Sequence, residues 1–94
     1  MKMPDFLKST QEMVFQAFPN GVNEERYWVL IYLLYDYILD ENLALVLSNV
    51  IDKPIEIITN DIYKINNLKL NEKAIQEVKC KLNIHGFEEW KKHE

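Results

Sequence analysis

The sequence predicts a single all-α domain (residues 1–94), a compact bundle of four to five helices with a buried central helix at about residues 24–39. Gly occurs twice and Pro three times in the 94 residues, too few for the many turns of a sandwich or barrel. The stretch from Tyr27 to Leu39 has five aromatic residues and one charged residue. A surface helix keeps a polar face, so this stretch is expected inside the bundle.

The first helix is expected from Pro4 or Asp5 to Ala17, because a proline suits a first turn and an acidic residue suits the positive end of the helix dipole. Its apolar stripe follows helical spacing and comprises Phe6, Thr10, Met13, Val14 and Ala17. Gly21 allows a positive φ in the turn that follows. Phe18 and Val22 flank this turn and are expected to fold back into the core.

The central helix is expected to begin after Asn23, a favourable N-cap residue. At about 100° per residue, its side chains form two stripes. The first, expected in the core, is Tyr27, Leu30, Ile31, Leu34 and Ile38. The second is Trp28, Tyr32, Tyr35 and Leu39. Val29 and Asp36 fall on the remaining side, where Asp36 marks the face toward water.

A third helix is expected after Asp40, which can cap it, and ends before Pro54. Its predicted core face is Leu43, Val46, Leu47 and Val50, with Leu45 pointing away. Residues 54–58 are rich in β-branched side chains, which suits a strand, but a lone strand is not stable. We therefore favour a helix that begins near Pro54 or is capped by Thr59, ends near residues 66–67 and buries Ile58, Ile62 and Ile65.

The last predicted helix runs from Asn71 to about His85 and buries Ala74, Ile75, Val78 and Leu82. Gly86 fits the residue just past a helix end, where a positive φ is common, and Phe87 fits the hydrophobic contact that accompanies it. Residues 88–94 are expected to be a frayed tail, held in place only if Trp90 packs.

Composition excludes several classes of function. The net charge is −4, and no basic stripe of the kind that binds phosphates is present. We therefore expect no nucleic-acid partner, and the acidic balance favours a protein partner. Cys80 is the only cysteine, which is typical of a reducing compartment. The N-terminus has no apolar signal segment, and the stretch 27–39 is shorter than the about 20 residues that span a bilayer. We expect a cytoplasmic protein that is not inserted in a membrane.

The candidate chemical groups favour no enzyme. Cys80 and His85 are five residues apart and point about 140° apart on a helix, so they form no thiol–base pair. A structural zinc site needs four ligands, which these two and His93 do not supply. Asp36, Asp40 and Glu41 cluster at one helix junction, but capping and the helix dipole account for them. With no phosphate loop or hydrolase motif present, we expect no catalytic residue, no cofactor and no metal.

One candidate interaction surface remains, and we assign to it Trp28, Tyr32, Tyr35, Asp36, Asp40 and Glu41. Tyr and Trp are enriched at binding hot spots because they combine apolar area with a polar group. The alternative is that another helix covers the aromatic stripe. The leading hypothesis is a non-enzymatic protein–protein interaction module, including a homodimer. The alternatives are an immunity- or antitoxin-like protein that neutralises a basic partner, and a small-molecule binder.

Several of these motifs together resemble a known family. They are the Phe18-Pro19-Asn20-Gly21-Val22 turn, the apolar stretch 27–39, the acidic start at Asp40-Glu41, the Ile62 and Ile65 pair, and the ending with Val78, Leu82, Gly86 and Phe87. In this combination the chain resembles, over about residues 15–88, the bacterial family called domain of unknown function 3349. This chain has fewer Arg and Ala residues and a more aromatic stretch at 27–39 than that pattern. The resemblance implies an all-α bundle with no assigned activity, and therefore no catalytic residue to carry over.

Overall fold

The all-α prediction is confirmed by the structure, a computed structural model that describes residues 5–92 apart from the side chain of Phe6. Within these residues there are six α-helices and no strand. The elements are α1 (Asp5–Ala17), α2 (Glu24–Leu34), α3 (Asp40–Val50), α4 (Ile55–Lys64), the 3-10 turn η1 (Ile65–Asn67), α5 (Glu72–Ile84) and α6 (Phe87–Lys91). A helix start at Pro4 lies outside the described residues.

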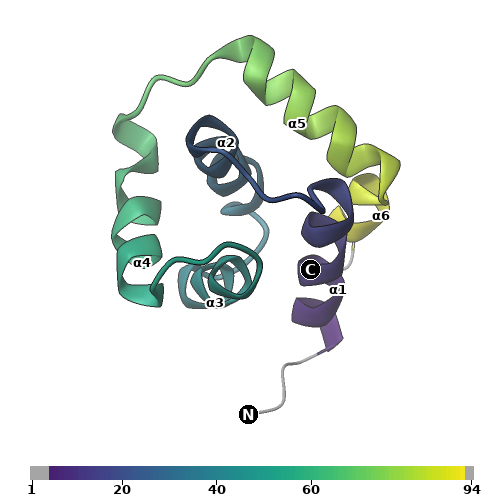
Figure 1. The fold of residues 1–94 in the computed structure, drawn as a ribbon, viewed down its shortest axis with the longest axis horizontal. Helices are drawn as coiled ribbons and strands as arrows, with labels where there is room; N and C mark the ends of the chain where they lie inside the picture. The colour runs from purple at the N-terminus through teal and green to yellow at the C-terminus, as the bar shows by residue number, and fades with distance from the viewer. Residues whose placement is uncertain (1–4, 93–94) are drawn as a thin grey trace.

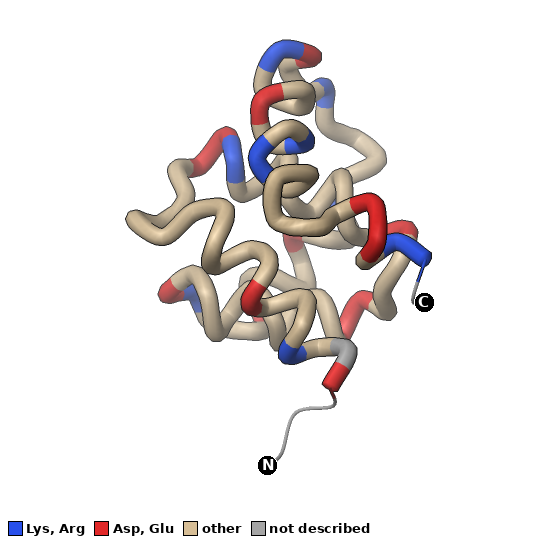
Figure 2. Tube along the Cα trace, turned by 90° about the vertical axis from the view of Figure 1, so that its right-hand side faces the viewer, with Lys and Arg blue, Asp and Glu red and all other residues tan. Residues whose placement is uncertain are grey.

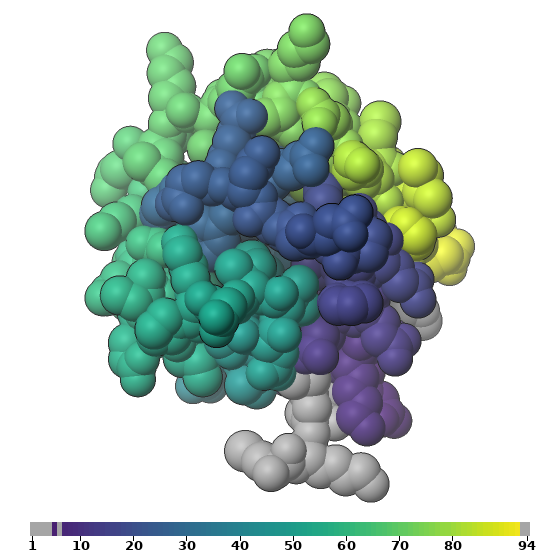
Figure 3. All heavy atoms as spheres, in the orientation of Figure 1, coloured from purple at the N-terminus to yellow at the C-terminus, as the bar shows by residue number. Residues whose placement is uncertain are grey.

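The helices surround α2, which lies in the middle of Figure 1. One side of the molecule is made by α3 packed on α4, and α1 packs on α3. The other side is made by α5, which packs on α2, with α6 and α1 beside it (Figure 1). Side chains fill the spaces between the ribbons on the face seen in Figure 3. The radius of gyration is 12.2 Å, about the 12 Å expected of a compact chain of this length.

The first stripe of α2 forms the centre of the core, as predicted. Its five side chains are at most 7% exposed, and they are Tyr27, Leu30, Ile31, Leu34 and Ile38. The placement of Val29 on the side toward water is wrong, since Val29 is fully buried. Neighbouring helices therefore cover more of the circumference of α2 than the two stripes indicate, and Tyr32, at 44% exposed, marks its most open side.

The α1 stripe is also confirmed for Thr10, Met13, Val14 and Ala17, which are all buried. The side chain of Phe6 lies outside the described residues. The hydroxyl of buried Thr10 accepts a hydrogen bond of 2.6 Å from the indole Nε1 of Trp90. This bond joins the first helix to the last, so a polar residue on an apolar stripe is paired, as buried polar groups generally are.

The ambiguous segment that starts at Pro54 is helical. Pro54 occupies the N-cap position of α4, and Ile58, Ile62 and Ile65 are buried together in the core. The alternative with Thr59 as the cap is wrong, because Thr59 lies inside α4 and its hydroxyl donates to the carbonyl of Ile55. The stability of the segment comes from packing on α3 rather than from the helix propensity of its β-branched residues.

The asparagine caps and the glycine turns are found where expected. The side chain of Asn23 accepts from the amide of Arg26, and the side chain of Asn71 accepts from the amide of Lys73. Gly21 and Gly86 have positive φ values of 96° and 92°, a region that favours glycine. Phe18 is buried and Val22 packs on the core.

The end of the chain meets the condition under which it is expected to be held in place, because Trp90 packs. Residues Phe87–Lys91 form α6, and both Phe87 and Trp90 are buried. Their rings are stacked on each other at 5.8 Å between centroids. These two large aromatic side chains remove enough apolar area from water to order one helical turn. Residues 93–94 lie outside the described part of the chain.

Candidate functional site

The central helix ends five residues earlier than predicted, and this early end creates the candidate site. The helix α2 stops at Leu34 instead of continuing to Leu39. The amide of Tyr37 donates to the carbonyl of Leu34, which tightens the chain into a turn. The ring of Tyr37 then packs edge-on against Phe87 and Trp90 of α6. Contacts with α6 therefore hold Tyr37 outside the helix, although its spacing from the earlier aromatic residues suits a continued helix.

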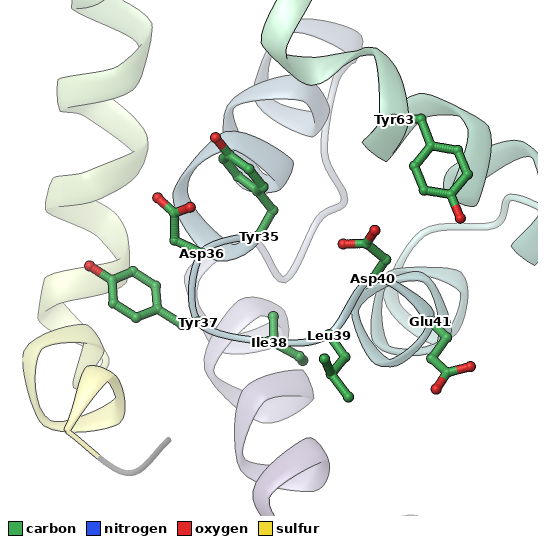
Figure 4. Close-up of a pocket in the computed structure, with 8 residues that line it drawn as sticks. All are labelled: Tyr35, Asp36, Tyr37, Ile38, Leu39, Asp40, Glu41 and Tyr63. Atoms are coloured by element: carbon green, nitrogen blue, oxygen red, sulfur yellow. The ribbon is translucent and has the colours of Figure 1, made fainter.

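An open hollow of about 630 Å³ lies where this turn meets α3 and α4. Eight residues line it, and we call it the acidic hollow: Tyr35, Asp36, Tyr37, Ile38, Leu39, Asp40, Glu41 and Tyr63. In Figure 4 the carboxylate of Asp40 points toward the space between the rings of Tyr35 and Tyr63. Tyr37 and Asp36 point away on the side of α5, and Leu39 and Glu41 point away on the opposite side (Figure 4). The hollow thus combines aromatic walls with carboxylates.

The charge of the hollow is entirely negative. Among residues 5–92, its lining contains Asp36, Asp40 and Glu41 and no Lys or Arg. In the described part of the chain, none of these three carboxylates forms an ion pair. Asp40 and Glu41 lie in the first turn of α3, where the helix dipole favours negative charge. The dipole therefore stabilises two of the carboxylates without neutralising them.

The expectation that Asp40 caps the third helix is wrong. Leu39 occupies the N-cap position, and no side chain makes a capping hydrogen bond there. Asp40 is instead the first residue of the helix itself. Its carboxylate is therefore not used for the cap, and it points into the hollow (Figure 4).

Two large side chains at the hollow are exposed to water. Leu39 is 68% exposed and Tyr63 is 65% exposed. The hydroxyl of Tyr35, by contrast, donates a hydrogen bond of 3.0 Å to the side-chain oxygen of Asn66. The wall formed by Tyr35 is thereby fixed to η1, while Leu39 and Tyr63 are the two exposed large apolar side chains of the lining, which we call the rim.

The six residues predicted for the interaction surface are divided by the fold. Tyr35, Asp36, Asp40 and Glu41 line the acidic hollow. Tyr32 lines a separate groove against α5, where it is joined by Tyr35 and Asp36. Trp28 is half-buried, packs edge-on against the Tyr27 ring and lines a third depression beside residues 68–71. The second stripe is thus neither fully buried nor one continuous surface.

Four lining residues are absent from the predicted surface, namely Tyr37, Ile38, Leu39 and Tyr63. Of these, Tyr63 alone comes from another helix. Tyr63 lies on α4, four residues after Thr59 and eight after Ile55, so these three side chains form one stripe. The stripe runs beside the buried face of Ile58, Ile62 and Ile65. A large aromatic residue just outside a three-isoleucine core face was the available signal. Its pairing with the start of α3 depends on the packing of α3 on α4, which a single sequence does not contain.

A second group of tyrosine and carboxylate side chains surrounds a lysine, and it extends from buried Tyr27 and Asp61 to the surface. We call it the lysine cluster: Glu24, Tyr27, Lys53 and Asp61. The Tyr27 hydroxyl donates a hydrogen bond of 2.6 Å to Oδ2 of Asp61. The Nζ atom of Lys53 lies 3.8 Å above the centre of the Tyr27 ring. It is 3.7 Å from Oε1 of Glu24 and 4.0 Å from Oδ2 of Asp61. Burial and the hydrogen bond to Asp61 raise the pKa of Tyr27 far above its ordinary value.

The remaining candidate groups are dispersed. Cys80 and His85 are both exposed, and His93 lies outside the described residues. Among residues 5–92, no group of three or more His, Cys, Asp or Glu side chains is arranged to hold a metal ion. No helix in this part of the chain is long and apolar enough to cross a bilayer. Along the trace in Figure 2, acidic and basic residues are interspersed.

Comparison with known proteins adds no relative. No protein-family model, curated protein sequence or solved structure matches this chain.

Proposed function

We propose that the protein is a non-enzymatic protein-binding module that contacts its partner through the acidic hollow. The observation that carries the proposal is the exposure of Leu39 and Tyr63 at the rim of a hollow lined by three carboxylates. Exposed apolar side chains beside polar groups are typical of surfaces that a partner covers. The single exposed thiol of Cys80 fits a reducing compartment such as the cytoplasm.

The partner is proposed to differ from a second copy of this chain. A symmetric pair made through the hollow would place Asp36, Asp40 and Glu41 of one copy against the same residues of the other. Like charges brought together at an interface are unfavourable. This argument favours a hetero-complex over the homodimer.

Binding of a partner explains the hollow better than catalysis or tight binding of a small ligand. Small-molecule sites enclose most of the ligand surface, whereas this hollow is open and its Asp36 and Glu41 side chains are exposed. Catalytic carboxylates work where water is excluded. A small-molecule binder that uses Asp36 beside a tyrosine hydroxyl remains the competing proposal.

The acidic lining also favours the more specific alternative of an immunity- or antitoxin-like protein. Such a protein neutralises a basic partner, and the hollow supplies negative charge with no positive side chain in its lining. The resemblance to the domain of unknown function 3349 family is kept as a proposal and gives no residue a role.

The test is capture of partner proteins from an extract of the native host on three immobilised proteins, read by mass spectrometry. They are the wild type, a rim variant with Leu39→Ser and Tyr63→Ser, and a control variant with Phe15→Ser and Ile84→Ser. The control changes two other exposed apolar residues, away from the hollow. We expect a protein that the wild type and the control capture and the rim variant loses. Equal capture by the rim variant contradicts the proposal.

A further inference from the structure

In the lysine cluster, the protein itself places a cation between a tyrosine ring and carboxylates. The Lys53 ammonium lies over the Tyr27 ring and beside Glu24 and Asp61. A cation over an aromatic face is attracted by the negative charge of the ring. The two carboxylates add to this attraction in a partly buried setting. Three contacts of two kinds thus converge on one positive charge.

The acidic hollow presents the same chemical groups without a cation of its own. Tyr35 and Tyr63 supply the rings and Asp40 supplies the carboxylate that faces them, while Asp36 and Glu41 also line the hollow with side chains that point away from the two rings (Figure 4). The Asp40 carboxylate points toward the space between the two rings (Figure 4). In the described part of the chain, no Lys or Arg lines this hollow or forms an ion pair with its carboxylates.

We propose that the acidic hollow takes an arginine side chain of the protein partner, between the Tyr35 and Tyr63 rings and against Asp40. This inference rests on the proposed function. A guanidinium group is planar, so it stacks on an aromatic ring and donates two parallel hydrogen bonds to one carboxylate. The exposed rim residues Leu39 and Tyr63 then meet an apolar side chain next to that arginine in the partner.

The direct test is an NMR titration of the ¹⁵N-labelled protein with two short peptides. The first is acetyl-Leu-Arg-Leu-Arg-Leu-amide, and the second replaces each arginine with citrulline, which keeps the shape and removes the charge. We expect the arginine peptide to bind at least about tenfold more tightly. The shifted amides are expected at residues 35–41 and at Tyr63. Equal affinities, or shifts centred elsewhere, overturn the inference.

Two charge-matched variants separate a site from a general acidic field. The hollow variant carries Asp36→Asn, Asp40→Asn and Glu41→Gln. The control variant carries Glu12→Gln, Asp52→Asn and Glu56→Gln, all at exposed residues outside the hollow. We expect the hollow variant to lose the preference for arginine over citrulline and the control to keep it. Equal losses in both variants overturn the inference.

Three further arms complete the experiment. The single variant Asp40→Asn is used if the hollow variant does not give a folded spectrum, and the same loss of preference is expected. The variant Tyr63→Leu keeps apolar area and removes the ring, so it is expected to weaken the arginine peptide more than the citrulline peptide. If N-acetylarginine amide alone binds as tightly as the peptide, the occupant is a small cation, and the inference of a protein partner is overturned.

The outcome also distinguishes this inference from the proposed function. Suppose the wild type captures a partner that the rim variant loses. Suppose also that the hollow variant and its charge-matched control variant capture this partner equally. The protein-binding function then stands, and the arginine inference fails. If the rim variant captures the same proteins as the wild type, the proposed function itself fails.

Discussion

The lysine cluster and the acidic hollow contain the same chemical groups in opposite settings. In the first, buried Tyr27 and Asp61 hold Lys53 from the loop between α3 and α4. In the second, tyrosines and carboxylates line an open hollow with no lysine or arginine in its lining. This difference in burial and charge indicates that the two regions have different roles. The cluster stabilises the fold by joining α2, α4 and the loop, whereas the hollow is open to a group from outside.

The largest expected difference between the two regions is in stability. Asp61→Ala leaves the Tyr27 hydroxyl buried without its acceptor and removes a carboxylate near Lys53. We expect a loss of about 3 kcal/mol in the free energy of unfolding. Asp40→Ala in the hollow is expected to lose less than about 1 kcal/mol, because it removes one partly exposed charge near a helix end. Urea unfolding of both variants measures these losses. Equal losses would contradict the assignment of a stabilising role to the lysine cluster and not to the acidic hollow.

The next effect is a dependence on pH above about 10. In the folded protein the pKa of Tyr27 is raised, so it keeps its proton where the unfolded chain loses it near pH 10. The folded state then binds more protons, and stability falls as pH rises, by up to about 1.4 kcal/mol per pH unit. Urea unfolding between pH 8 and 11 tests this. Tyr27→Phe should remove this contribution, while Tyr32→Phe should keep it. If the free energy of unfolding of Tyr27→Phe falls with rising pH as steeply as that of the wild type, the raised pKa of Tyr27 in the lysine cluster is contradicted.

A smaller effect is expected from removing the cation. Lys53→Met keeps an unbranched side chain that is one atom shorter and loses the charge over the Tyr27 ring. We expect thermal unfolding to report a loss of about 1 kcal/mol, since Lys53 is partly exposed. Lys64→Met, at an exposed lysine with no ion pair in the described residues, serves as the control. A loss no larger than the control would mean that the cation is incidental to the cluster.

The smallest change in stability is expected from neutralising the hollow. The variant with Asp36→Asn, Asp40→Asn and Glu41→Gln loses the favourable dipole interaction but also relieves repulsion between neighbouring carboxylates. We expect its free energy of unfolding to stay within about 1 kcal/mol of the wild type. A large loss, measured by urea unfolding, would assign the hollow a role in the fold and remove the contrast with the lysine cluster.

The sequence predicts the fold well where local periodicity controls it. The Tyr27 stripe, the isoleucine face of α4 and the glycines at positions 21 and 86 were all identified from spacing and turn chemistry. From the sequence, the order of the last residues is only conditional on the packing of Trp90, because that packing depends on contacts with Thr10, 80 residues away. Such long-range pairs are invisible to periodicity.

The candidate site was only partly predictable. Tyr35, Asp36, Asp40 and Glu41 were chosen from residue type and position, and the fold places them around one hollow. Trp28 shares the helical stripe but lies near the start of α2, where it lines a different depression beside residues 68–71. Tyr63 was missed because it comes from α4, and the lysine cluster was missed because Lys53 and Asp61 meet Tyr27 only after α4 packs.

The most direct test of the contrast is a double-mutant cycle between the hollow and its proposed occupant. The affinities of the wild type and Asp40→Asn for the arginine and citrulline peptides give four values. Their combination isolates the coupling between the Asp40 carboxylate and the guanidinium group. We predict a coupling of at least about 1 kcal/mol in favour of the charged pair. A coupling of zero would show that Asp40 does not contact the cation and would contradict the account.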